Sequence, residues 1–336
     1  MIPEDCNFTE IFSRYPREFR PSRPPIFLGN AGGLSGARYW TYDCAFGRLA
    51  LKAWPIDGPD RSRLQRIHAE IAKAKTLAFV PTLLPDHNAR TFQESFGFLW
   101  EIMPWLPGKA DRGRPPTLVH IRAGFAASAA LHRTWGAESQ SGRSPGLIRR
   151  LEEIQTWVSR DFTLLEDSLN GAADSVQKTL ARRWLELSRP AARVIEGEVR
   201  AGLKFETRLQ TCLRDLRGDH LLFDGDRLSG LVDFGALDLD VVSTDLARLL
   251  EDWIGEDRAA RAEALASYTG VRPLSIAETK LIDAFEHSSA LLIGGHWARR
   301  RFVENRAFED PAAVARGLER GIDRLARWIA SHGRMG

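Results

Sequence analysis

Short segments in the first hundred residues are either continuously apolar or alternate apolar and polar positions, and both patterns are typical of β-strands. The four clearest segments are residues 25–28, 38–43, 48–55 and 96–103. Between the third and the fourth, residues 61–79 carry Leu64, Ile67 and Ile71 at helical spacing. The pattern therefore predicts a sheet accompanied by one helix.

Helical spacing dominates from residue 117 onward. Residues 117–135 are rich in alanine and have a continuous apolar face, which predicts a buried helix. Two longer stretches, 147–168 and 174–202, alternate apolar and charged residues, and Pro190 is expected to break or kink the second. Residues 256–332 also have helical spacing.

A predicted hairpin separates these helical regions. Residues 221–223 and 228–232 are short apolar strands around the turn signal Asp-Gly-Asp at 224–226. Asp215 precedes the first strand and Asp233 follows the second, so both carboxylates can face one cleft. This spacing suits phosphoryl transfer, in which one carboxylate addresses a hydroxyl and the other holds a metal. Two loop carboxylates that cap helices or turns would explain the same residues.

The segments around these aspartates resemble the aminoglycoside phosphotransferase-like kinases, which share the bilobal fold of protein kinases. That family reads roughly His-Gly-Asp-Leu-His-x-x-Asn and then Ile-Asp-Phe-Gly, against LRDLRGDH at 213–220 and VDFG at 232–235 here. The resemblance implies an α+β fold. A small N-lobe, 1–104, would hold an antiparallel sheet and one helix, and a larger, mainly helical C-lobe would span 105–336. It also implies that Asp215 accepts the proton of the substrate hydroxyl and that Asp233 binds Mg²⁺.

Two positions depart from the family's pattern. Leu213 replaces the loop histidine, and His220 replaces the asparagine that binds a second Mg²⁺. Imidazole suits softer metals than Mg²⁺, so His220 is expected to weaken this metal site or to shift it toward Mn²⁺. Asp219 can supply the missing oxygen. The alternative is a catalytically weak or inactive nucleotide-binding module.

Residues 29–40 form a run of small residues between two predicted strands. Such a loop can bring backbone N–H groups against phosphate oxygens, and glycine permits the close approach. We expect Gly32, Gly33, Ser35 and Gly36 to contact the nucleotide. An ordinary hairpin turn would explain the same run.

A lysine and a carboxylate complete the expected phosphate site. Lys52 is the only ammonium group in its alternating strand, and the resemblance assigns it to the α- and β-phosphates of ATP. Its carboxylate partner should lie on the following helix, where Glu70 is the only acidic residue within 61–79. The alternative for Glu70 is a surface pair with Lys73 or Lys75.

The fourth strand leads into the proline- and glycine-containing segment MPWLPG at 103–108. In the family that this chain resembles, the two lobes join here and the backbone binds the adenine edge. Glu101 and Met103 are the residues expected at this hinge, although packing at a lobe junction would equally explain the apolar side chains.

Composition limits the other classes of function. The 336 residues have a net charge of +3 and only three cysteines, without metal-ligand spacing. Basic residues cluster at 299–301 and near 316–327, but no base-stacking motif accompanies them, so we expect solvated helix faces and no nucleic-acid partner. No apolar run reaches the ~18 residues of a membrane span, and the first residues lack a signal-peptide core. We therefore expect a cytoplasmic protein without membrane contact.

Together these features predict an ATP-dependent phosphotransferase acting on a hydroxyl of a small molecule. Aminoglycosides, choline-like alcohols, amino-acid alcohols and sugars are all compatible acceptors. A protein kinase is disfavoured because residues 234–245 leave little room for a long activation loop. The sequence assigns neither the oligomeric state nor a preference between ATP and GTP.

Overall fold

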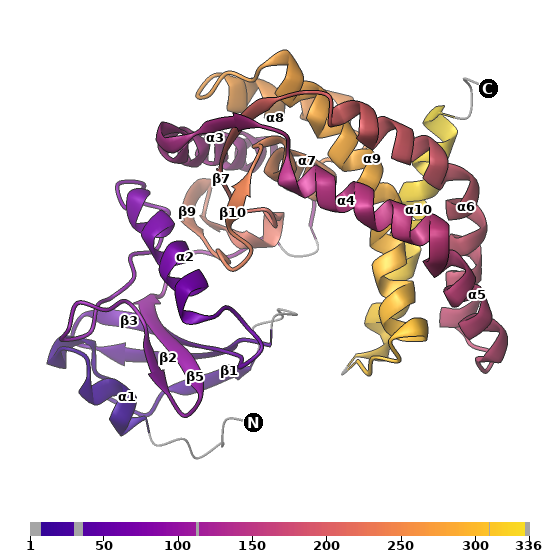
Figure 1. Ribbon diagram of the computed structural model, residues 1–336. Coiled ribbons are helices and arrows are strands. Elements are labelled where there is room, and N and C mark those ends of the chain that lie inside the picture. Colours follow the sequence, from indigo (N-terminus) through magenta and orange to yellow (C-terminus); the bar gives the residue numbers. More distant parts are fainter. Residues whose placement is uncertain (1–7, 30–35, 112–113, 309, 333–336) are drawn as a thin grey trace. The chain divides into compact units, whose positions relative to one another are not determined.

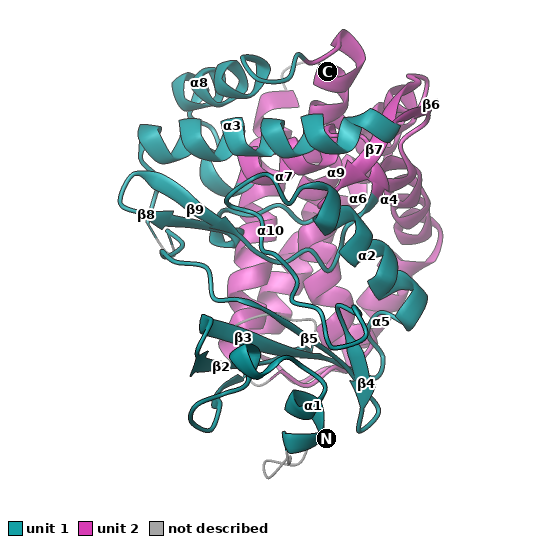
Figure 2. Ribbon diagram, turned by 90° about the vertical axis from the view of Figure 1, so that its left-hand side faces the viewer, with its two compact units in different colours: residues 1–138, 215–238, 252–273 teal, residues 139–214, 239–251, 274–336 magenta. Residues whose placement is uncertain are grey.

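The computed structural model describes residues 8–29, 36–111, 114–308 and 310–332. The chain forms two compact units, each built from three segments (Figure 2). Unit 1 comprises residues 1–138, 215–238 and 252–273, and unit 2 comprises residues 139–214, 239–251 and 274–336. These units do not follow the expected boundary after residue 104, which stays a prediction.

Unit 1 contains a five-stranded antiparallel sheet with the order β1-β2-β3-β5-β4 (Figure 1). Its strands are β1 (Ile26–Gly29), β2 (Arg38–Cys44), β3 (Gly47–Trp54), β4 (Gln93–Ser95) and β5 (Phe98–Pro104). The four strands expected from the alternating pattern are all present. Trp40, Leu51 and Trp100 pack in the core of this sheet, together with the short helix α1 (Thr9–Ser13).

Helix α2 (Arg61–Lys73) begins where Asp60 accepts a hydrogen bond from the backbone N–H of Arg63. Its apolar face buries Leu64, Ile67 and Ile71, as the spacing predicts. The helix ends six residues before the expected position 79. In the next residues, the backbone hydrogen bonds join residues three positions apart instead of four. Examples are the bonds from the N–H of Ala74 to the oxygen of Ile71 and from the N–H of Leu77 to the oxygen of Ala74.

The remainder of unit 1 comes from the rest of the first segment and from the two later segments, 215–238 and 252–273. Its elements are α3 (Leu118–Trp135), β8 (Leu221–Asp224), β9 (Arg227–Leu231) and α8 (Arg258–Thr269), with one-turn helices at Arg17–Phe19, Gly136–Glu138 and Gly218–His220. β8 and β9 pair antiparallel around Gly225, whose φ of +58° suits a tight turn. The predicted hairpin is therefore confirmed.

Unit 2 is mainly helical. Its elements are β6 (Gln140–Gly142), α4 (Pro145–Thr156), α5 (Phe162–Gly171), α6 (Val176–Gly202), β7 (Thr207–Cys212), β10 (Asp238–Asp240), α7 (Ser243–Trp253), α9 (Ile276–Ala298) and α10 (Pro311–His332), with π-helical turns at Trp157–Asp161 and Arg299–Val303. The ends of β10 and α7 belong to unit 1. The expected helix at 147–168 is divided by the first π turn, and α6 continues through Pro190 without a break.

Helices α6, α9 and α10 lie side by side in unit 2 (Figures 1 and 2). Two glycines of α9 allow this packing, because a Cβ on Gly294 would lie 2.3 Å from Trp184 and one on Gly295 would lie 2.9 Å from Trp157. Among the helices that the structure describes, none has the length and apolar character that crossing a membrane requires.

Candidate active site

A cavity of about 460 Å³ lies within unit 1. Strands β3 and β5, helix α2, the segment after β5 and residues 217–235 contribute to its wall. Among its polar lining residues are Lys52, His68, Glu101, Arg217, Asp219, His220 and Asp233. The lysine and the second aspartate of the predicted site therefore line the same cavity.

Lys52 is buried in this wall opposite Glu101. The two residues are register partners in the β3–β5 ladder, and the Nζ of Lys52 lies 3.6 Å from Oε1 of Glu101. The same ammonium lies 3.3 Å from the centroid of the Trp54 ring, whose Nε1 donates a 2.9 Å hydrogen bond to Oε2 of Glu101. The strand ladder thus holds the charge pair in place.

Charge pairing controls the protonation of both groups. Burial opposes the charged form of Lys52, but Glu101, with Tyr39 and Asp233, outweighs it and raises the pKa of the lysine. Burial likewise opposes the charge on Glu101, but Lys52 and the hydrogen bonds from His68 and Trp54 lower its pKa to about 2. At neutral pH the cavity therefore holds an ammonium next to a carboxylate.

The prediction that Glu70 is the partner of Lys52 was wrong. Glu70 forms an ion pair with Lys73 at 2.8 Å, the surface alternative, while Lys52 pairs with Glu101 on β5. The connection to α2 comes from His68, whose Nε2 lies 2.7 Å from Oε2 of Glu101. His68 was not among the predicted site residues, although its position beside Ile67 and before Ile71 places it on the apolar face of the helix.

The two aspartates lie on constrained loops. Arg214, the residue before Asp215, has a φ of +65°, and Asp233 has a φ of +66°. Positive φ is costly for residues other than glycine and is often found at functional loops. Asp245 braces the first loop, because its carboxylate accepts the N–H groups of Leu213 and Arg214 at 2.7 and 2.6 Å. Asp215 is half-buried and is not among the residues that line the cavity.

Asp219 offers the best fit to a cation on this wall. Its Oδ1 is buried and accepts no hydrogen bond within the described part of the chain, so this oxygen is available to a metal. Nε2 of His220 lies 3.6 Å from both Asp219 and Asp233, but Arg217 donates a 3.1 Å hydrogen bond to that nitrogen. The imidazole lone pair is therefore used by Arg217, and the hard oxygens of Asp219 and Asp233 suit Mg²⁺ better.

The structure bears differently on the other residues that were predicted to contact the nucleotide. Gly32, Gly33 and Ser35 lie outside the described residues, while Gly36 has the positive φ, +72°, that this type of loop requires. Met103 lines the cavity, and the following residues 104–106 continue its wall. Glu101 was expected at the hinge through its backbone, yet its carboxylate is the partner of Lys52. The binding roles themselves stay predictions.

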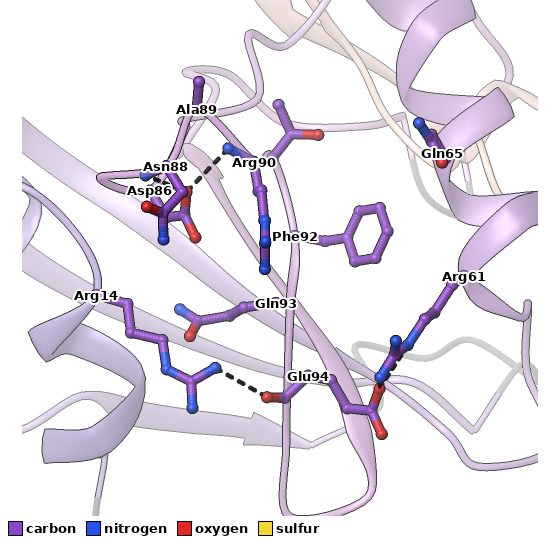
Figure 3. Close-up of a pocket in the computed structure, with 11 residues that line it drawn as sticks. Arg14, Arg61, Gln65, Asp86, Asn88, Ala89, Arg90, Phe92, Gln93 and Glu94 are labelled. Atoms are coloured by element: carbon purple, nitrogen blue, oxygen red, sulfur yellow. Dashed lines mark hydrogen bonds and ion pairs between the residues drawn. The ribbon is translucent and has the colours of Figure 1, made fainter.

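A larger hollow of about 810 Å³ opens elsewhere in unit 1 and shares no lining residue with the first (Figure 3). Four of its charged side chains have partners within unit 1. Arg14 donates to the backbone oxygen of Glu94, and Arg61 pairs with the Glu94 carboxylate. Asp86 accepts the N–H groups of Asn88 and Arg90. The cavity of Lys52 is therefore the candidate active site.

Comparisons with known proteins agree with this geometry. The homoserine kinase of Brucella anthropi is 30% identical over 189 residues, which is 53% of this chain and 50% of that enzyme. The homoserine kinase of Brucella melitensis is 37% identical over 100 residues, 28% of each protein. The chain thus spans half or less of the length of these relatives.

Solved structures share the fold at low sequence identity. The aminoglycoside phosphotransferase of Alicyclobacillus acidocaldarius matches with a TM-score of 0.67 and 13% identity over 96% of this chain and 94% of that one. A microcompartment-associated aminopropanol kinase matches with a TM-score of 0.61 and 15% identity over 97% of both chains. The α+β, protein-kinase-like fold is confirmed. Because the model of the phosphotransferase enzyme family, APH, matches residues 27–279, the chain belongs to that family.

Proposed function

We propose that this protein transfers the γ-phosphoryl group of ATP to a hydroxyl of a small amino alcohol. The observation that carries the proposal is the buried Lys52–Glu101 pair, which shares one cavity with Asp233. A fixed ammonium beside carboxylates is what a polyphosphate and its cation require. The relatives named homoserine kinase and aminopropanol kinase favour an acceptor that carries both an amine and a hydroxyl.

Each polar group would have a distinct role. Lys52 binds the α- and β-phosphates, and Glu101 holds it in place. Asp233 and Asp219 hold a divalent cation, preferably Mg²⁺, which neutralises charge on the phosphate oxygens when bound. Asp215 orients the acceptor hydroxyl and takes its proton. Gly36 and its preceding loop cover the phosphates, and the backbone near Met103 binds the adenine edge.

The test is a transfer assay over a panel of homoserine, aminopropanol, choline, sugars and aminoglycosides with ATP and either Mg²⁺ or Mn²⁺. Product is detected as the mass increase of one phosphoryl group. Asp215→Ala should lower turnover by roughly 10²–10⁴-fold and leave the thermal shift caused by ATP nearly unchanged. Equal turnover in this variant would refute the role of Asp215.

The second candidate is a nucleotide-binding module without turnover. Leu213, His220 and the hydrogen bond that Arg217 donates to His220 favour it, because they alter the loop that normally completes the metal site. ATP-dependent stabilisation without phosphorylated product, under either metal and for every acceptor, would select this candidate.

A further inference from the structure

Helices α6, α9 and α10 of unit 2 (Figure 1) carry Glu198, His287 and His332 in that order. The three side chains lie close together. One ligand-capable atom from each residue lies within 4.8 Å of the other two. Nδ1 of His287 is 2.8 Å from Oε2 of Glu198, and Nε2 of His332 is 3.7 Å from Oε1. All three side chains are about one quarter exposed, so an ion can reach them from solvent.

The hydrogen bonds of His332 leave its Nε2 atom, which faces Glu198, able to bind an ion. Nδ1 lies 2.9 Å from the backbone oxygen of Trp328 and 2.9 Å from Oγ of Ser331. The Ser331 hydroxyl donates its own proton to the same backbone oxygen, so both neighbours of Nδ1 accept and Nδ1 carries the proton. Nε2, the nitrogen that faces Glu198, then bears the lone pair. A metal-binding histidine commonly donates its other N–H to a backbone carbonyl in this way. The Trp328 ring stacks on the imidazole at 4.6 Å and fixes its plane.

A comparison within α9 shows that this cluster differs from an ordinary ion pair. His296 also meets a glutamate, with Nε2 2.8 Å from Oε1 of Glu153, but the guanidinium of Arg299 lies 3.4 Å from the same oxygen. Within the described residues, no lysine or arginine forms an ion pair with Glu198. One of its oxygens pairs with the imidazole of His287 and the other with that of His332.

We propose that Glu198, His287 and His332 form a zinc-binding site with water as the fourth ligand. Two imidazoles and a carboxylate are a common ligand set for tetrahedral Zn²⁺, and Mg²⁺ is a poor match because it prefers oxygen ligands. Ligand atoms of such a site are about 3.4 Å apart when metal–ligand bonds are about 2.1 Å, so small side-chain rotations close the cluster. For Nδ1 of His287 to bind the ion, the hydrogen that it donates to Glu198 must leave this nitrogen. The bound ion would join the last turn of α10 to α6 and α9.

The test uses the whole protein without nucleotide and with excess Mg²⁺. All proteins in the test, including the parent, also carry Asp219→Asn and Asp233→Asn, which remove both carboxylates proposed to hold a cation in the candidate active site. Zn²⁺ should raise the melting temperature, and one equivalent of Co²⁺ should give the visible absorption of a tetrahedral site. His332→Lys supplies an ammonium that can still pair with Glu198 but cannot bind metal at neutral pH. It should fold and weaken Zn²⁺ binding by at least about tenfold.

Glu198→Gln should have the same effect, while the control His296→Ala should bind Zn²⁺ as the parent protein does. Equal Co²⁺ absorption and equal Zn²⁺-dependent shifts in the parent and in His332→Lys would overturn the proposal. So would a parent protein that binds neither ion. Because no ATP or acceptor is present, these outcomes are independent of the proposed phosphotransferase activity.

Discussion

The carboxylate of Glu101 lies opposite the ammonium of Lys52 across the β3–β5 ladder, with 3.6 Å between Oε1 and Nζ. Backbone pairing of the two strands sets this distance, so movement of α2 need not break the pair. His68 then attaches α2 to the same carboxylate through its other oxygen. The helix therefore contributes to the site through a histidine, and the sheet supplies both charges.

Glu101→Gln should destabilise the protein by about 3–5 kcal/mol, because it removes the carboxylate that pairs directly with the buried ammonium of Lys52. It should also weaken ATP binding, since the lysine is no longer held. Urea unfolding measures the first effect, and ATP-dependent thermal shift measures the second. Glu70→Gln is the matched control. It removes a pair with the half-exposed Lys73 and should cost about 1 kcal/mol or less. A larger loss of ATP binding in Glu70→Gln than in Glu101→Gln would contradict the assignment.

The low pKa of Glu101 predicts how stability changes in acid. Its pKa falls from 4.5 to about 2 on folding, so its carboxylate stabilises the folded state above pH 4.5. That contribution is lost as the pH decreases from 4.5 toward 2 and the carboxylate becomes protonated. Urea unfolding at several pH values should therefore show a flatter decline for Glu101→Gln than for the wild type over this range. Parallel declines would mean that Glu101 is not the group responsible.

The strands, the hairpin and Lys52 could be predicted because they depend on local alternation and turn residues. The partner of Lys52 could not, because Glu101 is 49 positions away and only strand register brings it into place. Helical periodicity could also have predicted that His68 is buried. The face that buries Leu64, Ile67 and Ile71 also carries His68, while Glu70 pairs with Lys73.

In unit 2, the spacing of apolar residues did not predict a division within a helix. A helix was expected over 147–168, but five residues, Trp157–Asp161, form a π turn that divides it. Arg299 pairs with Asp161 there and lies 4.7 Å from the centroid of the Trp157 ring. These contacts join segments about 140 residues apart in sequence, and such tertiary contacts leave no periodic signal.

Asp219 should be a stronger determinant of metal binding than His220. Asp219→Asn should raise the Mg²⁺ concentration needed for half of the ATP-dependent thermal shift by about tenfold or more. The reason is that Asp219→Asn replaces a charged carboxylate at the cavity wall by a neutral amide. Within the described residues, Oδ1 of that carboxylate accepts no hydrogen bond and can therefore bind the ion. Asp224→Asn, an exposed change in the hairpin that follows Asp219, should leave the Mg²⁺ requirement unchanged. If His220→Ala raises the Mg²⁺ requirement more than Asp219→Asn, then the imidazole is the ligand.

Alanine substitutions at two glycines in neighbouring helices should change the stability of the protein in opposite directions. Gly197 is exposed within α6, and a Cβ there would meet no atom within 4 Å, so Gly197→Ala should stabilise the protein by about 0.5–1 kcal/mol. A Cβ on Gly294 of α9 would lie 2.3 Å from Trp184, which is fully buried and packs edge-on against Trp157 at 5.0 Å. Gly294→Ala should therefore cost about 1–3 kcal/mol. Urea unfolding of both variants checks the prediction, and a stabilising Gly294→Ala would mean that α9 can move away from Trp184 at little cost.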